Sequence, residues 1–506
     1  MKPRNHFGAA PRPRFRWPLA AALAVCAFLA PGSAETEAAP APATHPNIVL
    51  IVADDLGWSD LACYGADLHE TPNIDALAAS GMRFTQAYAP APVCSPTRAA
   101  LLTGRAPARL GMTTWSEGAL DPADDRPLLP APSKPNLPRS EVSLARLLQA
   151  AGYRTALVGK WHLGDADHAP ETHGFDVNIG GTRWGAPATY FWPYRSPDHS
   201  GKEFRYVPHL EFGKPGEYLT DRLTDEAVRV IDRLNGESPP FFLMVAHHAP
   251  HTPIEAPSGD VEFFQRKLTP AHHQRNPAYA AMVRRLDSGV GRIVETLKSR
   301  SLLDRTIVVF TSDNGGYIGI DRRQTIPVTT NAPLRSGKAS LYEGGLRVPL
   351  VVRWPGVTPA GTVSETPVIL TDLFHTLRPL AGSSPPPGPA PATEDGLDLG
   401  PVLRDPKATL HREALYFHFP HYYHAPATTP VGAIRAGDWK LIEHFEDNRL
   451  ELFDLSADPG ETNDLSQSLP DRVRELQGRL AAWRRDVAAR LPTPNPARAT
   501  PSGRTQ

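Results

Sequence analysis

Short, largely apolar runs recur along the chain, and between them lie longer segments in which apolar residues return every three or four positions. The runs, each a predicted strand, are Asn47–Ala53, Tyr153–Val158, Phe241–Ala246, Thr306–Phe310 and Leu350–Trp354. The segments with helical periodicity are 140–152, 219–234, 276–302 and 371–380. Strands that are apolar on both faces are typical of a parallel sheet covered by helices on both sides. We therefore predict an α/β fold with a mixed, mostly parallel sheet flanked by helices.

The pattern changes beyond residue 381. Residues 382–395 are rich in Pro, Gly and Ser, which predicts a linker between a large domain, 46–381, and a C-terminal subdomain, 396–491. Short predicted strands follow at 414–419, 431–436, 439–445 and 450–454, and a predicted helix at 469–490. This order predicts a small antiparallel sheet with a covering helix. A disordered tail, 492–506, is expected after it.

The N-terminal segment has the features of a secretory signal peptide. Three arginines, Arg12, Arg14 and Arg16, precede an apolar run over 17–31 and a small-residue site that ends at Ala34. We predict a signal peptide over 1–34 and an Ala/Pro-rich spacer over 35–45. The alternative, a membrane anchor, needs a longer apolar span than this one. The protein is therefore expected to be secreted or periplasmic.

Charge narrows the classes of partner. The formal net charge of the 506 residues is -1, so the chain lacks the general positive field expected of a nucleic-acid-binding protein. An anionic substrate would have to be attracted by a local cluster of cations. No other apolar stretch is long enough to span a bilayer, so we expect no stable membrane span in the mature chain.

Charged and polar residues gather where the predicted strands end. In chain order they are Asp54 and Asp55, then Lys160 and His162, then His247, His248 and His251, then Asp313 and Asn314. Open α/β sheets bind ligands at this edge. Adjacent residues of a strand point to opposite faces, so Asp54 and Asp55 reach one ion only if the backbone turns, and Gly57 can supply such a turn. The alternative is a solvated acidic turn.

Three carboxylates and one amide form an oxygen site suited to Ca²⁺, and less well to Mg²⁺. The three histidines would suit zinc, but the carboxylates favour a harder cation and the histidines lack helical spacing. We expect His251 to be an acid or a contact on the substrate side and leave the roles of His247 and His248 open. Lys338, which follows Gly337, is a candidate contact for an anion.

A possible nucleophile stands in the segment 94–105. Ser95 is a suitable N-cap, Pro96 suits the first helical position, and Gly104 can close the helix. Cys94 would then lie just before a helix N-terminus, which favours an anion, with Arg98 one turn away. The alternative is a buried structural cysteine.

The string Cys94-Ser95-Pro96-Thr97-Arg98 closely resembles the signature of the type I sulfatases, in which the Cys of Cys-x-Pro-x-Arg is oxidised to formylglycine. Matching motifs follow in order over roughly 45–465: Asp54-Asp55, Gly159-Lys160-Trp161-His162, Pro250-His251-Thr252-Pro253, Asp313-Asn314-Gly315 and Gly337-Lys338. The resemblance implies an alkaline-phosphatase-like fold with 46–381 as the catalytic domain, one Ca²⁺, and a partner enzyme that matures Cys94. A disulfide between Cys63 and Cys94 would consume the nucleophile, so none is expected.

The resemblance also implies roles. Asp54, Asp55, Asp313 and Asn314, together with residue 94, would hold Ca²⁺, and the added positive charges would come from Arg98, Lys160 and Lys338. One hydroxyl of the hydrated formylglycine would attack sulfur, and the second would be deprotonated by a base such as His162. His251, with Lys338, would protonate the leaving oxygen.

The predicted substrate is a sulfated sugar of the galactose or N-acetylgalactosamine type, cleaved by an exo-acting enzyme, or an aryl sulfate. A long loop, 184–214, is expected over the site, where Trp184, Tyr190, Trp192 and Arg195 would either contact a sugar or pack within the loop. The cluster 417–424 can reach the rim of the site. Two alternatives stay open: a phosphonate or phosphodiester hydrolase of the same superfamily, and a non-catalytic protein that binds sulfated glycans.

Overall fold

The computed structural model describes residues 45–120, 124–197, 201, 204–237, 239–321, 323–382, 395–424 and 427–498. The predicted signal peptide, all of the spacer except His45, the linker residues 383–394 and the tail residues 499–506 lie outside these ranges. The predictions made for them, and the division into two domains, therefore stay predictions. Among the described helices, none has the length and apolar character needed to cross a membrane.

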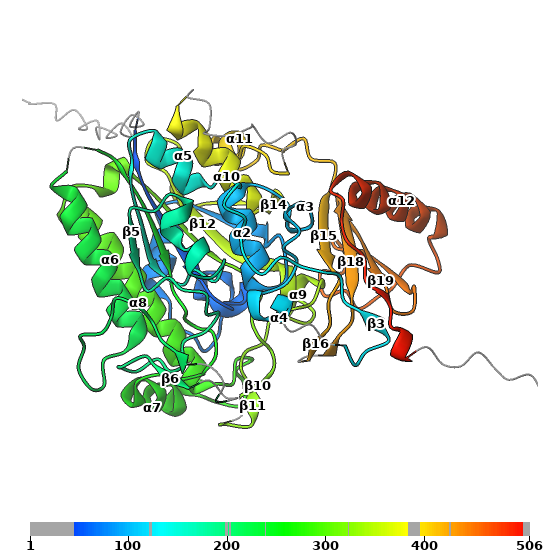
Figure 1. Ribbon diagram of the computed structural model, residues 1–506, viewed down its shortest axis with the longest axis horizontal. Coiled ribbons are helices and arrows are strands. Elements are labelled where there is room, and N and C mark those ends of the chain that lie inside the picture. The colour runs from blue at the N-terminus through cyan, green and yellow to red at the C-terminus, as the bar shows by residue number, and fades with distance from the viewer. Residues whose placement is uncertain are drawn as a thin grey trace, which may run out of the picture. The chain divides into compact units, whose positions relative to one another are not determined.

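Within the described residues, a nine-stranded sheet forms the centre of the fold (Figure 1). Its order is β13 (Thr362–Ser364), β2 (Met82–Tyr88), β12 (Arg347–Arg353), β9 (Thr306–Ser312), β1 (Asn47–Ala53), β8 (Phe241–Ala246), β4 (Arg154–Gly159) and β5 (Val177–Ile179), with β14 (Val368–Ile369) also paired to β2. The strands from β9 to β5 run parallel, whereas β12 is antiparallel to both of its neighbours. The prediction of a mixed, mostly parallel sheet is confirmed.

Helices cover both faces of this sheet, because alternate residues of each strand point to opposite sides. In β1, Val49 and Ile51 join one apolar cluster, while Ile48, Leu50 and Val52 join the other. The first face is covered by α1 (Pro72–Ala79), α6 (Leu219–Asn235) and α8 (Pro277–Ser299), and the second by α2 (Cys94–Thr103), α5 (Leu144–Ala150) and α10 (Thr371–Leu377). The other α-helices of this part are α3 (Pro107–Leu110), α4 (Ser116–Leu120), α7 (Ser258–Lys267), α9 (Glu343–Leu346) and α11 (Gly400–Arg404).

The start of α2 differs from the prediction. Ser95 is not the N-cap, because the helix already begins at Cys94 and Val93 occupies the cap. The Ser95 hydroxyl instead donates a hydrogen bond of 2.8 Å to the carbonyl oxygen of His162. Gly104 ends the helix in the left-handed region, at a φ of 68°, as predicted. The serine therefore joins two parts of the site rather than capping a helix.

The C-terminal part forms the predicted antiparallel sheet with a helix. Its strands are β15 (Leu415–Phe419), β18 (Val431–Ala436), β19 (Trp439–His444) and β20 (Leu450–Asp454), and α12 (Pro470–Asp486) packs on one face. Side chains of the other face join residues of the large sheet and α9 in one apolar cluster. Two-stranded pairs complete the described fold: β6 (Ser196–Pro197) with β7 (Phe204–Arg205), β10 (Ile320–Asp321) with β11 (Ile326–Pro327), and β16 (Tyr423–His424) with β17 (Ala427–Thr428).

The tail prediction is wrong for residues 492–498. Strand β21 (Thr493–Pro494) pairs with β3 (Leu128–Leu129), and Asn495 is buried beside it. The Asn495 side-chain amide donates 2.8 Å hydrogen bonds to the carbonyl oxygens of Asp124 and Arg126. The composition of the tail gave no sign of this contact, because its partners lie more than 360 residues away in the sequence.

Replacing Asn495 by Ala is expected to lower the free energy of unfolding by about 2 kcal/mol, because the two hydrogen bonds donated by this buried side chain are lost. Denaturant unfolding measures the change, and Thr493→Ala, at an exposed position of the same strand, is the matched control. Equal stability of the two variants would show that this contact does not hold the tail.

Candidate active site

Five of the polar residues that follow the strands come together at one edge of the sheet, through pairs that join Asp54 with Lys160 and Asp55 with both Asp313 and Asn314. The turn that brings Asp54 and Asp55 to one place is made by Asp55 itself, whose φ of 63° is in the left-handed region. Gly57 has an extended φ of -70° and does not make the turn, contrary to the prediction. It is needed for close packing instead, because a Cβ there would lie 2.3 Å from Oδ1 of Asn331.

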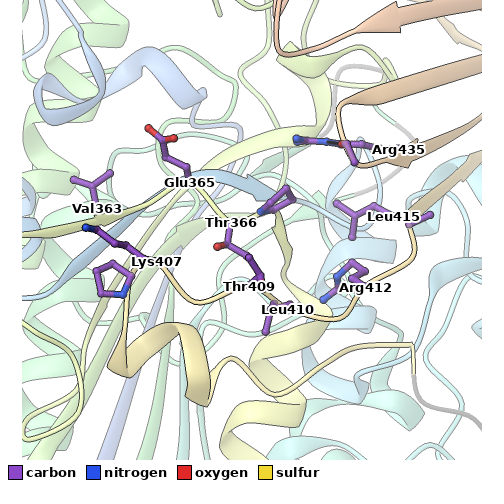
Figure 2. A pocket seen from close by; sticks show the side chains of 13 residues that line it. Val363, Glu365, Thr366, Lys407, Thr409, Leu410, Arg412, Leu415 and Arg435 are labelled. Carbon is purple, nitrogen blue, oxygen red and sulfur yellow. Dashed lines mark hydrogen bonds between the residues drawn. The ribbon is translucent and has the colours of Figure 1, made fainter.

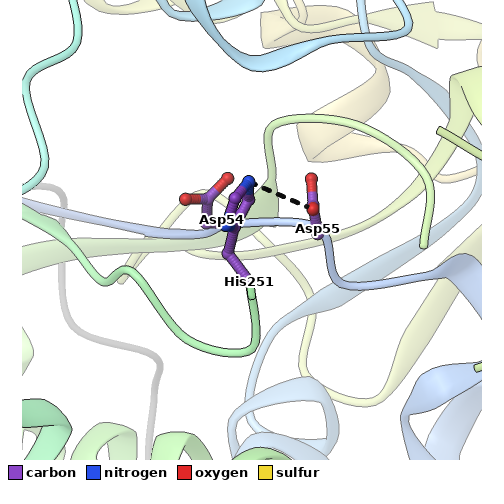
Figure 3. Close-up of side chains that lie close together, drawn as sticks. All are labelled: Asp54, Asp55 and His251. Atoms are coloured by element: carbon purple, nitrogen blue, oxygen red, sulfur yellow. Dashed lines mark ion pairs between the residues drawn. The ribbon is translucent and has the colours of Figure 1, made fainter. Parts of the chain in front are cut away.

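A group of oxygen and nitrogen atoms at this edge fits a cation. Ligand atoms of Asp54, Asp55 and His251 all lie within 4.8 Å of one another (Figure 3). Oδ1 of Asp54 and Oδ1 of Asn314 are buried without a hydrogen-bond partner. Burial and the nearby Asp313 carboxylate raise the pKa of Asp54 well above its ordinary value. Two buried oxygen atoms without a donor are acceptors that a hard cation could satisfy.

Asp313, His251 and Cys94 have different contacts at this site. Asp313 accepts the Asp55 backbone N–H through Oδ1, at 3.3 Å, and pairs with Arg98 through Oδ2, at 2.8 Å. His251, predicted only as an acid or a substrate contact, lies in the same group as Asp54 and Asp55. Cys94 lies outside that group, so its predicted place among the metal ligands stays a prediction.

Each buried carboxylate of the site already has one cationic partner. Three ion pairs are 2.7–2.8 Å long: Lys160 with Asp54, Arg98 with Asp313, and Lys338 with Asp55. Burial would raise the pKa of Asp55, but His251 and Lys338 face the carboxylate and its pKa lies at about 2. These cations are therefore held in place before any substrate enters, which lowers the cost of organising the site.

Cys94 and His162 form a hydrogen-bonded pair that includes a third residue, Glu117, which the sequence analysis missed. Sγ of Cys94 lies 3.3 Å from Nδ1 of His162, and Nε2 of the same ring lies 2.7 Å from Oε2 of Glu117. The other oxygen of Glu117 accepts the backbone N–H of Gly185 at 3.2 Å. Burial lowers the pKa of His162, but Cys94 and Glu117 outweigh it and raise the pKa to about 9. No motif marks Glu117, because its partners are distant in sequence.

His251 and Lys338 form a second pair. Nζ of Lys338 lies 3.0 Å from Nε2 of His251, and Nδ1 of the ring lies 2.8 Å from the Thr252 carbonyl oxygen. Burial lowers the pKa of His251 to about 3, so the imidazole is neutral near pH 7. Nδ1 then donates to Thr252, and Nε2 accepts from the Lys338 ammonium. The proton available at this pair belongs to Lys338 in the resting state.

The two pairs open on a cavity of about 190 Å³. Its lining includes Cys94, Glu117, His162, His251 and Lys338, together with Val93, Trp115, Gly185, Ala186, Arg205 and Tyr423. A larger cavity of about 620 Å³ lies elsewhere, against β13 and residues 406–415, and none of the predicted site residues lines it (Figure 2). The chemistry is therefore concentrated in the smaller cavity.

Comparison with known proteins identifies the family of this chain. A sequence model of the sulfatase family matches residues 46–383, and a model of the N-sulphoglucosamine sulphohydrolase C-terminal region matches residues 337–486. The chain belongs to the sulfatase family. It is 36% identical to N-acetylgalactosamine-6-sulfatase of Sus scrofa over 80% of this chain and 74% of the relative. It is 33% identical to steryl-sulfatase of Mus musculus over 96% of this chain and 88% of the relative.

A crystal structure of Ps i-CgsB in complex with k-i-k-neocarrahexaose is similar to this sulfatase, with a TM-score of 0.72 and 32% identity. The alignment covers 87% of this chain and 92% of that one. The sulfatase is thus a sulfuric ester hydrolase with an alkaline-phosphatase-like fold, as the motifs implied.

Some of the aromatic residues near the site are buried, and others line the cavity. The Tyr190 side chain is buried, with its hydroxyl 2.7 and 2.8 Å from the carbonyl oxygens of His248 and His251, so it positions the histidine loop and is not open to a sugar. Of the cluster 417–424, Tyr423 does reach the cavity, where its ring packs edge-on against Trp115 at 5.4 Å. His247 is buried, and burial lowers its pKa to about 4.

The unmodified thiol of Cys94 is expected to be unusually reactive. Burial would raise its pKa, but Lys160 and His162 lower it to about 6, whereas burial raises the pKa of the Cys63 thiol well above its ordinary value. In protein made without a maturing enzyme, iodoacetamide should label Cys94 at pH 7. Because the thiolate is lost as the pH falls through about 6, the labelling rate should fall about tenfold per pH unit below that value.

Mass spectrometry of the two cysteine peptides measures this rate. His162→Ala should move the midpoint toward the ordinary thiol value of about 8.5. Preferential labelling of Cys63, or an ordinary midpoint for Cys94 in the unaltered sequence, would contradict the electrostatic account.

Proposed function

We propose that this sulfatase hydrolyses sulfate monoesters on a sugar, using a formylglycine made from Cys94 and one bound Ca²⁺. The observation that carries the proposal is the position of Cys94, 3.3 Å from His162 in a cavity that His251 and Lys338 also line. A hydrated formylglycine at this position would supply two hydroxyls on one carbon, one to attack sulfur and one to permit release of sulfate.

His162 suits the role of the base in this reaction. A formylglycine at position 94 would remove the thiolate that raises the pKa of His162. In the neutral ring, Nε2–H donates a hydrogen bond to Glu117, and the lone pair of Nδ1 is directed at residue 94. Nδ1 can then take a proton from a hydroxyl on residue 94, and Glu117 stabilises the imidazolium that forms. Glu117 is thus a positioning residue for His162.

Lys338 and His251 suit the role of the acid. The ammonium of Lys338 holds the proton and donates to Nε2 of His251, which lies 3.4 Å from Asp55 at the metal-fitting group. Protonation of the leaving alcohol oxygen by this pair lowers the cost of breaking the S–O bond. The ion pair with Asp55 keeps the lysine in position.

Asp54, Asp55 and Asn314 would hold the cation, with His251 and Asp313 adjacent. Bound there, Ca²⁺ would polarise the sulfate oxygens. The unpartnered Oδ1 atoms of Asp54 and Asn314 support this assignment, since carboxylate and amide oxygens are the donors Ca²⁺ prefers. Mg²⁺ fits less well, because it demands a stricter octahedral geometry.

The size of the cavity favours a small sulfated unit. At about 190 Å³ it is smaller than the cavities of about 300–1,000 Å³ that hold drug-sized ligands, which supports exo-action on a single terminal sugar. Trp115 and Tyr423 offer aromatic surface at its wall. The names of the relatives, N-acetylgalactosamine-6-sulfatase above all, support a galactose or N-acetylgalactosamine type of unit.

The proposed enzyme would also need export and maturation. The predicted signal peptide would deliver the enzyme to the periplasm or the exterior. A formylglycine-generating or sulfatase-maturing enzyme would act on Cys94. The helix start would have to be unfolded for that enzyme, because Cys94 is buried and lines a cavity of about 190 Å³ that admits only a small molecule such as iodoacetamide.

Free sulfate released from a panel of monosulfated sugars and aryl sulfates tests the proposal. Sulfate release that depends on the aldehyde at position 94, detected by mass spectrometry, is the expected result. Faster turnover of phosphate or phosphonate esters of the same aryl alcohol would assign the chain to the alternative hydrolase class. Binding of a sulfated glycan without release of sulfate, by protein that carries the aldehyde, would make it a binding protein.

A further inference from the structure

One cation at the active-site cavity has no anionic partner among the described residues. Arg205, at the end of β7, lines the same cavity as Cys94. Its Nε is buried without a hydrogen-bond partner, and its guanidinium lies over the ring of Trp184, 5.3 Å from the ring centroid. The four carboxylates of the site are already paired with Lys160, Lys338, Arg98 and His162. Among the residues that the structure describes, no carboxylate therefore neutralises the positive charge that Arg205 brings to the cavity.

The segment that carries this charge is fixed against the reacting centre. Gly185 packs on the imidazole of His162 so closely that a Cβ would lie 2.3 Å from Cε1 of the ring. The Gly185 N–H also donates to Glu117. Trp184, the neighbour of Gly185, is only 6% exposed and cannot swing away from this place. The Trp184 ring, which supports the Arg205 guanidinium, is thus held next to Gly185, which packs on His162.

We propose that Arg205, supported by Trp184, binds a second oxyanion of the substrate, beyond the sulfate that is cleaved, and so selects sugars that carry two or more anionic groups. This inference rests on the proposed function and names its substrate class more closely. The planar guanidinium can donate two parallel hydrogen bonds to a sulfate ester or to the carboxylate of a uronic acid. A ring that holds the guanidinium in advance reduces the entropy lost on binding.

Three disaccharides that share one cleavable sulfate on a galactose-type unit test the proposal. The second sugar is neutral in the first, carries a further sulfate in the second, and is a uronic acid in the third. The measured quantity is the ratio of kcat/KM for each dianionic sugar to that for the neutral one. Arg205→Ala is expected to lower at least one ratio by about tenfold, the size of a lost charge-assisted contact. The ratio that falls identifies the second oxyanion as sulfate or carboxylate.

Arg183→Ala is the matched control. Arg183 also lies over the Trp184 ring, 4.0 Å from its centroid, but it does not line the cavity, so its removal should leave both ratios unchanged. Unchanged ratios in Arg205→Ala, or an equal fall in both variants, would overturn the proposal.

The failure of the proposed function would be seen separately. If the mature enzyme releases no sulfate from any of the three sugars, the same ratios are taken from calorimetric affinities, measured with and without Arg205→Ala. A preference for dianionic sugars that disappears with Arg205 supports the second oxyanion site even then. Equal affinities for all three sugars overturn it.

Discussion

Replacement of Cys94 by Ala is expected to reduce sulfate release by at least about 10⁴-fold, because the variant loses the only nucleophile that the proposed reaction has. The loss should fall on kcat. Arg98, Lys160 and Lys338 are held by ion pairs with Asp313, Asp54 and Asp55, none of which involves Cys94. These cations therefore stay in place in the variant and can still bind a sulfated sugar. Free sulfate, followed over many turnovers, measures the effect.

Cys94→Ser gives the more discriminating result. A serine hydroxyl can accept the sulfuryl group but has no second hydroxyl on the same carbon to expel it. We expect at most one alcohol released per enzyme molecule, with the protein gaining the mass of one sulfate ester. Continuous turnover by either variant would remove formylglycine from the mechanism. Thermal unfolding of both variants checks that the fold is intact.

Replacement of Asp54 by Asn is expected to lower the affinity for Ca²⁺ by about 100-fold or more, since a direct ligand and its charge are lost together. Lys160, which is buried, would also lose its ion pair with the Asp54 carboxylate. Elemental analysis of the purified protein should find about one Ca²⁺ per chain in the unaltered enzyme and far less in the variant. Activity should fall with metal content and return in part at high Ca²⁺ concentration.

Asp287→Asn is the matched control for this experiment. Asp287 is also buried, but it accepts the backbone N–H groups of Asn73 and Ile74 at the start of α1, away from the strand ends. Its replacement should lower stability without changing the metal content. Equal metal content in Asp54→Asn and the unaltered enzyme would exclude Asp54 from the cation site.

Most elements of the fold could be predicted because their signals are local. After Asn47, every residue of the run 47–53 is apolar, so both faces of a strand formed by it would be apolar. This is typical of a strand buried on two sides, and the structure has β1 over the same residues. The helix over 276–302 was predicted from a repeat that continues for several turns, and α8 occupies 277–299. The differences are confined to the ends, where caps such as Asn276 decide the boundary.

Part of the site was equally open to prediction. Asp54, Lys160 and Asp313 follow strands directly, and the carboxyl ends of parallel strands lie at one edge. Their meeting therefore follows from the fold class. Cys94 and Lys338 were placed by their motifs.

The strands, the sheet edge and the residue types gathered there could be predicted from the amino-acid sequence, because apolar periodicity and strand-end positions are properties of neighbouring residues. The support of His162 by Glu117, the place of Arg205 at the cavity and the anchoring of the tail by Asn495 are known from the folded structure alone. Each of these contacts joins segments far apart in the chain through one or two polar atoms. Such a contact leaves no repeating pattern in either segment, so it can be recognised only in the folded structure.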